Sequence, residues 1–72
     1  MSVSFVLPGE GPATLDLVDI AGRLVERHEV GVMGAGAHHL ELGRAAPLHA
    51  GLYFVRLTQG AHRLTTRATV IP

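Results

Sequence analysis

Histidine is the residue type in this chain whose chemistry most directly suggests a site. The 72 residues include five of them, which are His28, His38, His39, His49 and His62. Zinc needs three or four ligands that converge on one point. His38 and His39 are adjacent, so on a strand they point to opposite faces. Glu26 shares a face with His28, but no third ligand joins that pair. The spacing favours surface or half-buried histidines, and no metal site is predicted.

The carboxylates form neither a calcium-binding nor a catalytic pattern. Asp16 and Asp19 stand three residues apart with no third acid beside them, whereas calcium needs clustered oxygen ligands. Asp19 is instead expected to hydrogen-bond the backbone of a turn. Glu26 and Glu29 fall on opposite faces of a strand, so they are not placed as an acid–base pair. We therefore expect a protein that is not an enzyme, with no catalytic residue and no cofactor.

Charge and composition argue against several functional classes. Six Lys+Arg residues, all of them arginine, balance six Asp+Glu residues. Nucleic acids and anionic membrane surfaces are bound by basic patches, so neither partner is expected of a neutral chain. No run of about 18 apolar residues is present, so no membrane span is expected. The first residues lack the pattern of a signal peptide, which would place any export signal elsewhere in a longer parent protein.

Glycine and proline divide the chain into six short runs, which is typical of an all-β fold. The predicted strands cover residues 2–7, 13–18, 23–30, 37–42, 52–58 and 62–71. Loops are expected at 8–12 and 31–36, with a longer irregular connection at 43–51. Because the other links are of hairpin length, antiparallel pairing is favoured. Residues 1–72 are predicted to form one small antiparallel Ig-like β-sandwich of about six to seven strands.

Alternation along the last two strands separates core positions from surface positions. Tyr53 shares its parity with Val55 and Leu57, so it is expected in the core with its hydroxyl reaching a partner at the sandwich edge. Gly51 is expected to permit the bend into that strand. Arg67 falls on the opposite parity from Ala68, as expected of a solvated cation that guards an edge strand against aggregation.

Three motifs, in this order and spacing, carry a resemblance to a known family that extends over residues 3–71. They are Asp19-Ile20-Ala21-Gly22-Arg23, then Gly51-Leu52-Tyr53, then a cation in the last strand, Arg67. Together they resemble the C-terminal sorting domain of the bacterial type IX secretion system. They are equally similar to the Ig-like domain of the flagellar hook-capping protein. Sorting domains usually carry lysine where this chain has Arg67, and an aromatic residue where it has Leu42.

The resemblance implies a non-catalytic sorting and attachment module at the C-terminus of an exported bacterial protein. Its partner would be the outer-membrane translocon or a surface-attachment protein, and its location would be secreted or at the cell surface. The implied recognition or structural residues are Asp19, Gly22, Arg23, Gly51, Tyr53 and Arg67. The alternative is a structural or adhesive Ig-like module, such as a spacer or a hook-capping-like assembly domain. That module could form a homo-oligomer through the strand edge at Ala68 and Val70.

Overall fold

The chain is described by a computed structural model that covers residues 1–44 and 47–71. The elements are β1 (Ser2–Leu7), β2 (Thr14–Asp19), β3 (Leu24–Glu29), η1 (Gly31–Met33), β4 (Gly36–Glu41), β5 (Gly51–Gln59) and β6 (His62–Val70). The strands match the six predicted ones to within one residue at each end. The 31–36 segment contains one turn of 3-10 helix, where a loop was predicted. The predicted connection at 43–51 includes 45–46, which lie outside the described residues.

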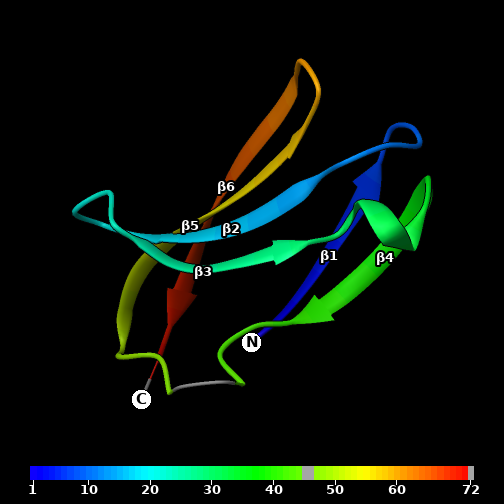
Figure 1. Cartoon of the computed structure of the whole chain (residues 1–72). Helices are drawn as coiled ribbons and strands as arrows, with labels where there is room; N and C mark the ends of the chain where they lie inside the picture. The colour runs from blue at the N-terminus through cyan, green and yellow to red at the C-terminus, as the bar shows by residue number, and fades with distance from the viewer. Residues whose placement is uncertain (45–46, 72) are drawn as a thin grey trace.

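The six strands form two antiparallel sheets (Figure 1). One sheet pairs β1 with β4, and the other has the order β3-β2-β5-β6. Both hairpins, β2–β3 and β5–β6, lie in the four-stranded sheet, while the chain leaves that sheet for β4 and then returns. The predicted small antiparallel β-sandwich is confirmed.

The core lies between the two sheets and follows the alternation of the strands. In β5, Tyr53, Val55 and Leu57 are buried, whereas the residues between them are half-exposed. The core residues are Phe5, Leu7, Ala13, Leu15, Leu17, Val30, Leu42, Tyr53, Val55 and Leu57. Each fully buried leucine stabilises the fold by roughly 1.5–3 kcal/mol relative to an exposed position. Leucine and valine dominate this core, and only Phe5 and Tyr53 in it are aromatic.

Strand β3 departs from simple alternation. The register between β2 and β3 shifts at Leu17/Val18, so Leu24 pairs with Val18 and Glu26 with Leu17. This bulge leaves both Leu24 and Val25 exposed, although alternation would have buried one of them. The half-buried positions of β3 are Glu26 and His28. This edge of the four-stranded sheet therefore presents polar side chains where an apolar row would be usual.

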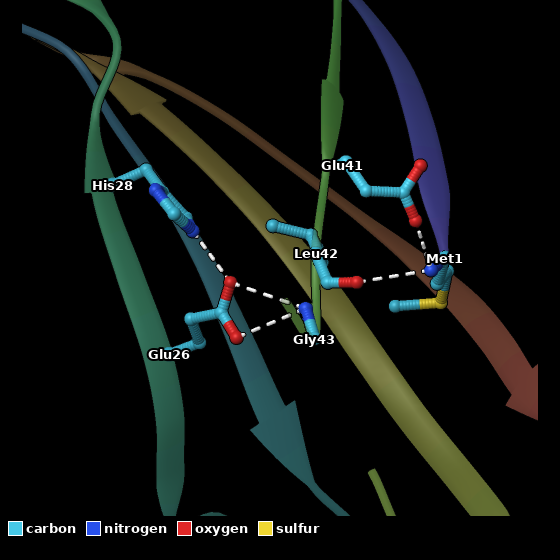
Figure 2. A network of polar contacts seen from close by, with 6 residues as sticks. All are labelled: Met1, Glu26, His28, Glu41, Leu42 and Gly43. Atoms are coloured by element: carbon cyan, nitrogen blue, oxygen red, sulfur yellow. Dashed lines mark hydrogen bonds and ion pairs between the residues drawn. The ribbon is translucent and has the colours of Figure 1, made fainter. Parts of the chain in front are cut away.

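The polar side chains of β3 connect the two sheets, as Figure 2 shows. The Glu26 carboxylate accepts a hydrogen bond from the backbone N–H of Gly43, at 3.1 Å, just after β4. The same carboxylate lies 2.5 Å from His28 Nε2. On the other side of β4, the amino group of Met1 contacts the Glu41 carboxylate and donates to the Leu42 carbonyl oxygen. Polar contacts thus link β3 to the end of β4 and fasten β1 along the other side of β4.

The end of the β5–β6 hairpin is fastened to the loop between β1 and β2. Gln59 is buried, and its side-chain oxygen accepts a hydrogen bond from the Gly9 N–H at 3.1 Å. Its amide nitrogen donates to the carbonyl oxygens of Gly9 and Gly11. Nearby, a Cβ atom at Gly31 would collide with the Gly11 carbonyl oxygen, so the close approach of these loops requires glycine there.

Candidate recognition surface

One face of the four-stranded sheet points away from the core and collects most of the arginines. Tyr53, Val55 and Leu57 point into the core, and side chains paired across an antiparallel ladder share a face. The intervening residues therefore point outward. Four arginines occupy outward positions: Arg27 on β3, Arg56 on β5, and Arg63 and Arg67 on β6. We call this surface the arginine face.

Asp16 lies at the centre of the arginine face. Its side chain is only 2% exposed because it sits on β2, between β3 and β5. Arg27 donates two hydrogen bonds to this carboxylate, from Nε at 2.8 Å and from Nη2 at 3.0 Å. Arg56 donates a third from the other side, at 3.3 Å. Two cations on the strands that flank β2 thus share one buried anion.

The two arginines keep Asp16 ionised. The hydrogen bonds from Arg27 lower the pKa of the Asp16 carboxyl below its usual value, and Arg56 adds to this effect. Burial acts in the opposite direction, since it disfavours the charged form. The same pairing raises the pKa of Arg27. Removing the partners of a buried carboxylate leaves its charge uncompensated and destabilises the fold, so the two arginines are needed as long as Asp16 is present.

The two arginines of β6 stand in a different setting. Arg67 pairs in register with Phe54 and Arg63 with Thr58, and both arginines are exposed. Within residues 1–44 and 47–71, no carboxylate lies within 4.0 Å of either guanidinium. The carboxylates at outward positions of this sheet's ladders, Asp16 and Glu29, are outnumbered by the four arginines. The arginine face is therefore cationic on a chain whose formal net charge is zero.

A shallow hollow of about 220 Å³ lies on the arginine face beside the β2–β3 turn. It is lined by Val18, Asp19, Ile20, Gly22, Phe54, Arg56 and Thr65. Ile20 is 73% exposed at its rim. Apolar and aromatic groups framed by arginine are the composition that protein-binding surfaces favour.

The predicted turn motif is built by Asp19 and Gly22. The Asp19 carboxylate accepts hydrogen bonds from the backbone N–H groups of Ala21, at 3.0 Å, and Arg23, at 2.8 Å. The Arg23 side chain also donates to it, at 3.2 Å. The backbone bond from Arg23 leads the contacts that lower the pKa of Asp19. Gly22 has a φ of +86°, as expected for the tight turn. The turn role predicted for Asp19 is confirmed.

Gly51 and Tyr53 lie away from the arginine face. Gly51 is the first residue of β5, and Tyr53 is on the core side of the same strand. Tyr53 is 7% exposed within the core, as predicted, and its hydroxyl donates to the His49 carbonyl oxygen at 2.6 Å. A tyrosine that bonds back to the backbone a few residues upstream is a recurring feature of Ig-like sandwiches. Gly51 begins β5, opposite Val70, with a φ of +152°. These two residues shape the fold rather than the exposed surface.

The structure brings three of the six predicted motif residues to one surface. Asp19 and Gly22 line the hollow, and Arg67 pairs in register with Phe54, another residue of its lining. The Arg23 side chain folds back onto Asp19. The sequence did not identify Asp16 as a buried anion. Its outward parity with the arginines was a signal, but the pairing depends on a strand order that places β2 between β3 and β5.

The histidines are dispersed over the fold. His38 packs against Phe5, with ring centroids 5.8 Å apart, and its Nε2 lies 2.7 Å from the Gly34 carbonyl oxygen. His39, its neighbour in sequence, is exposed, as their alternation predicted. In the described part of the chain, no group of three or more His, Cys, Asp or Glu side chains could hold a metal ion.

Comparison with known proteins adds no relatives. No protein-family model matches the chain, and no curated protein sequence matches it. Over the residues that the structure covers, no helix has the length and apolar character needed to cross a membrane. The resemblance to the sorting domain stays a prediction from the three motifs.

Proposed function

We propose that this chain is a non-catalytic sorting and attachment module, which outer-membrane secretion machinery of a bacterium recognises through the arginine face. The observation that carries the proposal is the position of Arg67. It is exposed on the edge strand and paired in register with Phe54, which lines the hollow beside the Asp19–Arg23 turn. Two of the three motifs behind the resemblance thus contribute to one surface.

The environment of Arg67 supports a role in binding rather than in folding. Arg27 and Arg56 are engaged with Asp16, whereas the described carboxylates leave Arg67 without an ion-pair partner. An arginine beside an aromatic side chain is a frequent source of binding energy at protein interfaces. The surrounding antiparallel sheet holds both groups on a rigid backbone, which lowers the entropic cost of binding.

A secretion assay tests the proposal. The domain is fused to the C-terminus of a reporter that carries a signal peptide, in a host with the type IX machinery. We expect the reporter to reach the cell surface or medium, and Arg67→Ala to retain it in the periplasm. Arg44→Ala removes an exposed arginine after β4 and serves as the matched control. Equal secretion of both variants, with folding checked by thermal unfolding, would contradict the proposal.

The alternative function is a structural or adhesive Ig-like module that self-associates through its strand edges. The observation in its favour is β6, which is nine residues long and lies at the edge of its sheet. Ala68 and Val70 pack against the core, so the groups offered to another copy are the backbone and the outward side chains. Sedimentation velocity over a range of concentrations tests this alternative, which predicts a dimer or larger species.

A further inference from the structure

An apolar groove runs along one flank of the sandwich, between β1 and β6. Two adjoining hollows of about 310 and 360 Å³ form it, and both are lined by Val6, Leu57 and Leu64. Core residues Leu15 and Val55 also line the second hollow. Val6 and Leu64 are 61% and 69% exposed, which is high for apolar side chains beside a core. The sandwich is therefore open along this flank, in contrast to the β3–β4 flank that Glu26 bridges.

Over the described residues, strand β6 borders the groove with one unpaired backbone edge. It is the last strand in the order β3-β2-β5-β6, and β5 is its ladder partner. In residues 1–44 and 47–71, no other strand pairs with it. A long edge strand presents backbone N–H and C=O groups. An extended peptide can hydrogen-bond these groups and so add a new strand to the sheet.

The two faces of β6 impose different requirements on such a peptide. Leu64 and Thr66 pair with the core residues Leu57 and Val55, so they face the groove. The side chains of an added strand that point toward the groove, as Leu64 and Thr66 do, need to be apolar to cover the groove. Arg63 and Arg67 point outward, four residues apart. Opposite charges that face each other across strands are favourable and like charges are unfavourable, so the outward side chains need to be acidic.

A second copy of this chain fits these requirements poorly. A β6–β6 pairing would gather four arginines on one face, Arg63 and Arg67 from each copy. The other edge strands of the two sheets are β1, β3 and β4. None of these three presents two acidic residues four apart, since β1 has no acid, the acids of β3 are Glu26 and Glu29, and β4 has Glu41 alone. Charge complementarity points to a different chain.

We propose that β6 and the β1–β6 groove bind an extended peptide of alternating apolar and acidic residues, added as a strand beside β6, with two acidic groups four residues apart. The inference rests on the proposed function, because it states the chemistry of the segment that the partner presents. The apolar side chains of the peptide cover Leu64 and Leu57, its backbone bonds the edge of β6, and its acidic groups face Arg63 and Arg67.

The test uses a synthetic nine-residue peptide with valine at alternate positions and two glutamates four apart among threonines. In an NMR titration we expect the amides of β6 and β1 to shift, and β6 amides that do not bond β5 to gain protection from hydrogen exchange. A peptide with lysine in place of both glutamates is expected to bind about tenfold more weakly, since both cross-strand pairs change sign. Equal binding of the two peptides, or shifts away from β1 and β6, overturns the inference.

Charge exchange gives a second and independent readout. The double variant Arg63→Glu, Arg67→Glu is expected to prefer the lysine peptide to the glutamate peptide. If the protein alone forms a dimer through β6 that excludes both peptides, a second copy is the occupant and the inference is overturned. The secretion assay separates this result from the proposed function. Peptide binding together with secretion that is insensitive to Arg67 contradicts the proposed function alone, whereas Arg67-dependent secretion without peptide binding contradicts the inference alone.

Discussion

The two pairs of arginines on the arginine face have the same chemistry but different surroundings. Arg27 and Arg56 flank the buried Asp16 and donate three hydrogen bonds to it. Arg63 and Arg67 lie on the edge strand, and the described carboxylates are beyond ion-pair distance from them. The first pair compensates a charge that the fold has buried. Among the described residues the second pair has no such charge to compensate, and it is the pair that the proposed function assigns to a partner.

The largest expected effect comes from removing the shared anion. Asp16→Asn leaves the Arg27 and Arg56 side chains close together without a counter-charge. We expect a loss of about 2 kcal/mol in the free energy of unfolding, below the range for fully buried pairs because both arginines reach solvent. This corresponds to a fall of roughly 10 °C in Tm for a domain of this size. Glu29→Gln is the control, since Glu29 is exposed. Equal Tm values for the two variants would contradict the central position given to Asp16.

The pH dependence of stability tests whether the charge of Asp16 is the source of this stabilisation. The pKa of Asp16 is lowered in the folded protein, so its contribution is complete above the unfolded value of about 3.9. That contribution is lost as the pH falls through the lower folded value. Urea unfolding between pH 2 and 6 should show the wild type losing its advantage over Asp16→Asn below about pH 4. A constant difference across this range would show that the carboxylate is not the source of the stabilisation.

The two partners of Asp16 should not contribute equally. Arg27 donates two hydrogen bonds, at 2.8 and 3.0 Å, whereas Arg56 donates one, at 3.3 Å. We therefore expect Arg27→Ala to lower the Tm more than Arg56→Ala, and each to lower it less than Asp16→Asn. Thermal unfolding followed by circular dichroism measures the order. If Arg56→Ala proves the more harmful, packing of its stem over the sheet outweighs the ion pair.

The smallest expected effect belongs to the edge strand. Arg63→Ala and Arg67→Ala should each change the free energy of unfolding by no more than about 0.5 kcal/mol, as exposed positions usually do. Chemical denaturation of the two variants beside the wild type gives the comparison. A loss as large as that of Asp16→Asn would place Arg67 among the residues that maintain the fold and would remove the contrast between the pairs.

Local patterns were enough to predict most of the fold. The alternation of Tyr53, Val55 and Leu57 set the inner face of β5, and Asp19 with Gly22 marked a turn whose contacts are all local. Relations between distant strands were beyond such patterns. Asp16 meets Arg56 only through the β2–β5 pairing, and Gln59 meets Gly9 only because two loops adjoin. The bulge that exposes Leu24 and Val25 also depends on the β2–β3 register.

The features of the candidate surface also separate into those that local patterns predict and those that depend on how distant strands pair. The alternation of residues in β6 was enough to predict that Arg67 points outward. Its proximity to Phe54 and to the hollow beside Ile20 required the order of the sheet. The open flank between β1 and β6 was also outside the reach of the sequence, because it is a relation between two sheets rather than a property of either strand.

The most direct test of the central claim is the secretion of the reporter fusion with Arg67→Lys against Arg67→Glu, with the Tm of each variant measured in parallel. We predict that the lysine variant, which keeps the cation on the arginine face, is secreted, and that the glutamate variant stays in the periplasm. Both should unfold within a few degrees of the wild type. Secretion of both variants, or failure of the glutamate variant through loss of folding, would contradict the claim that Arg67 serves recognition.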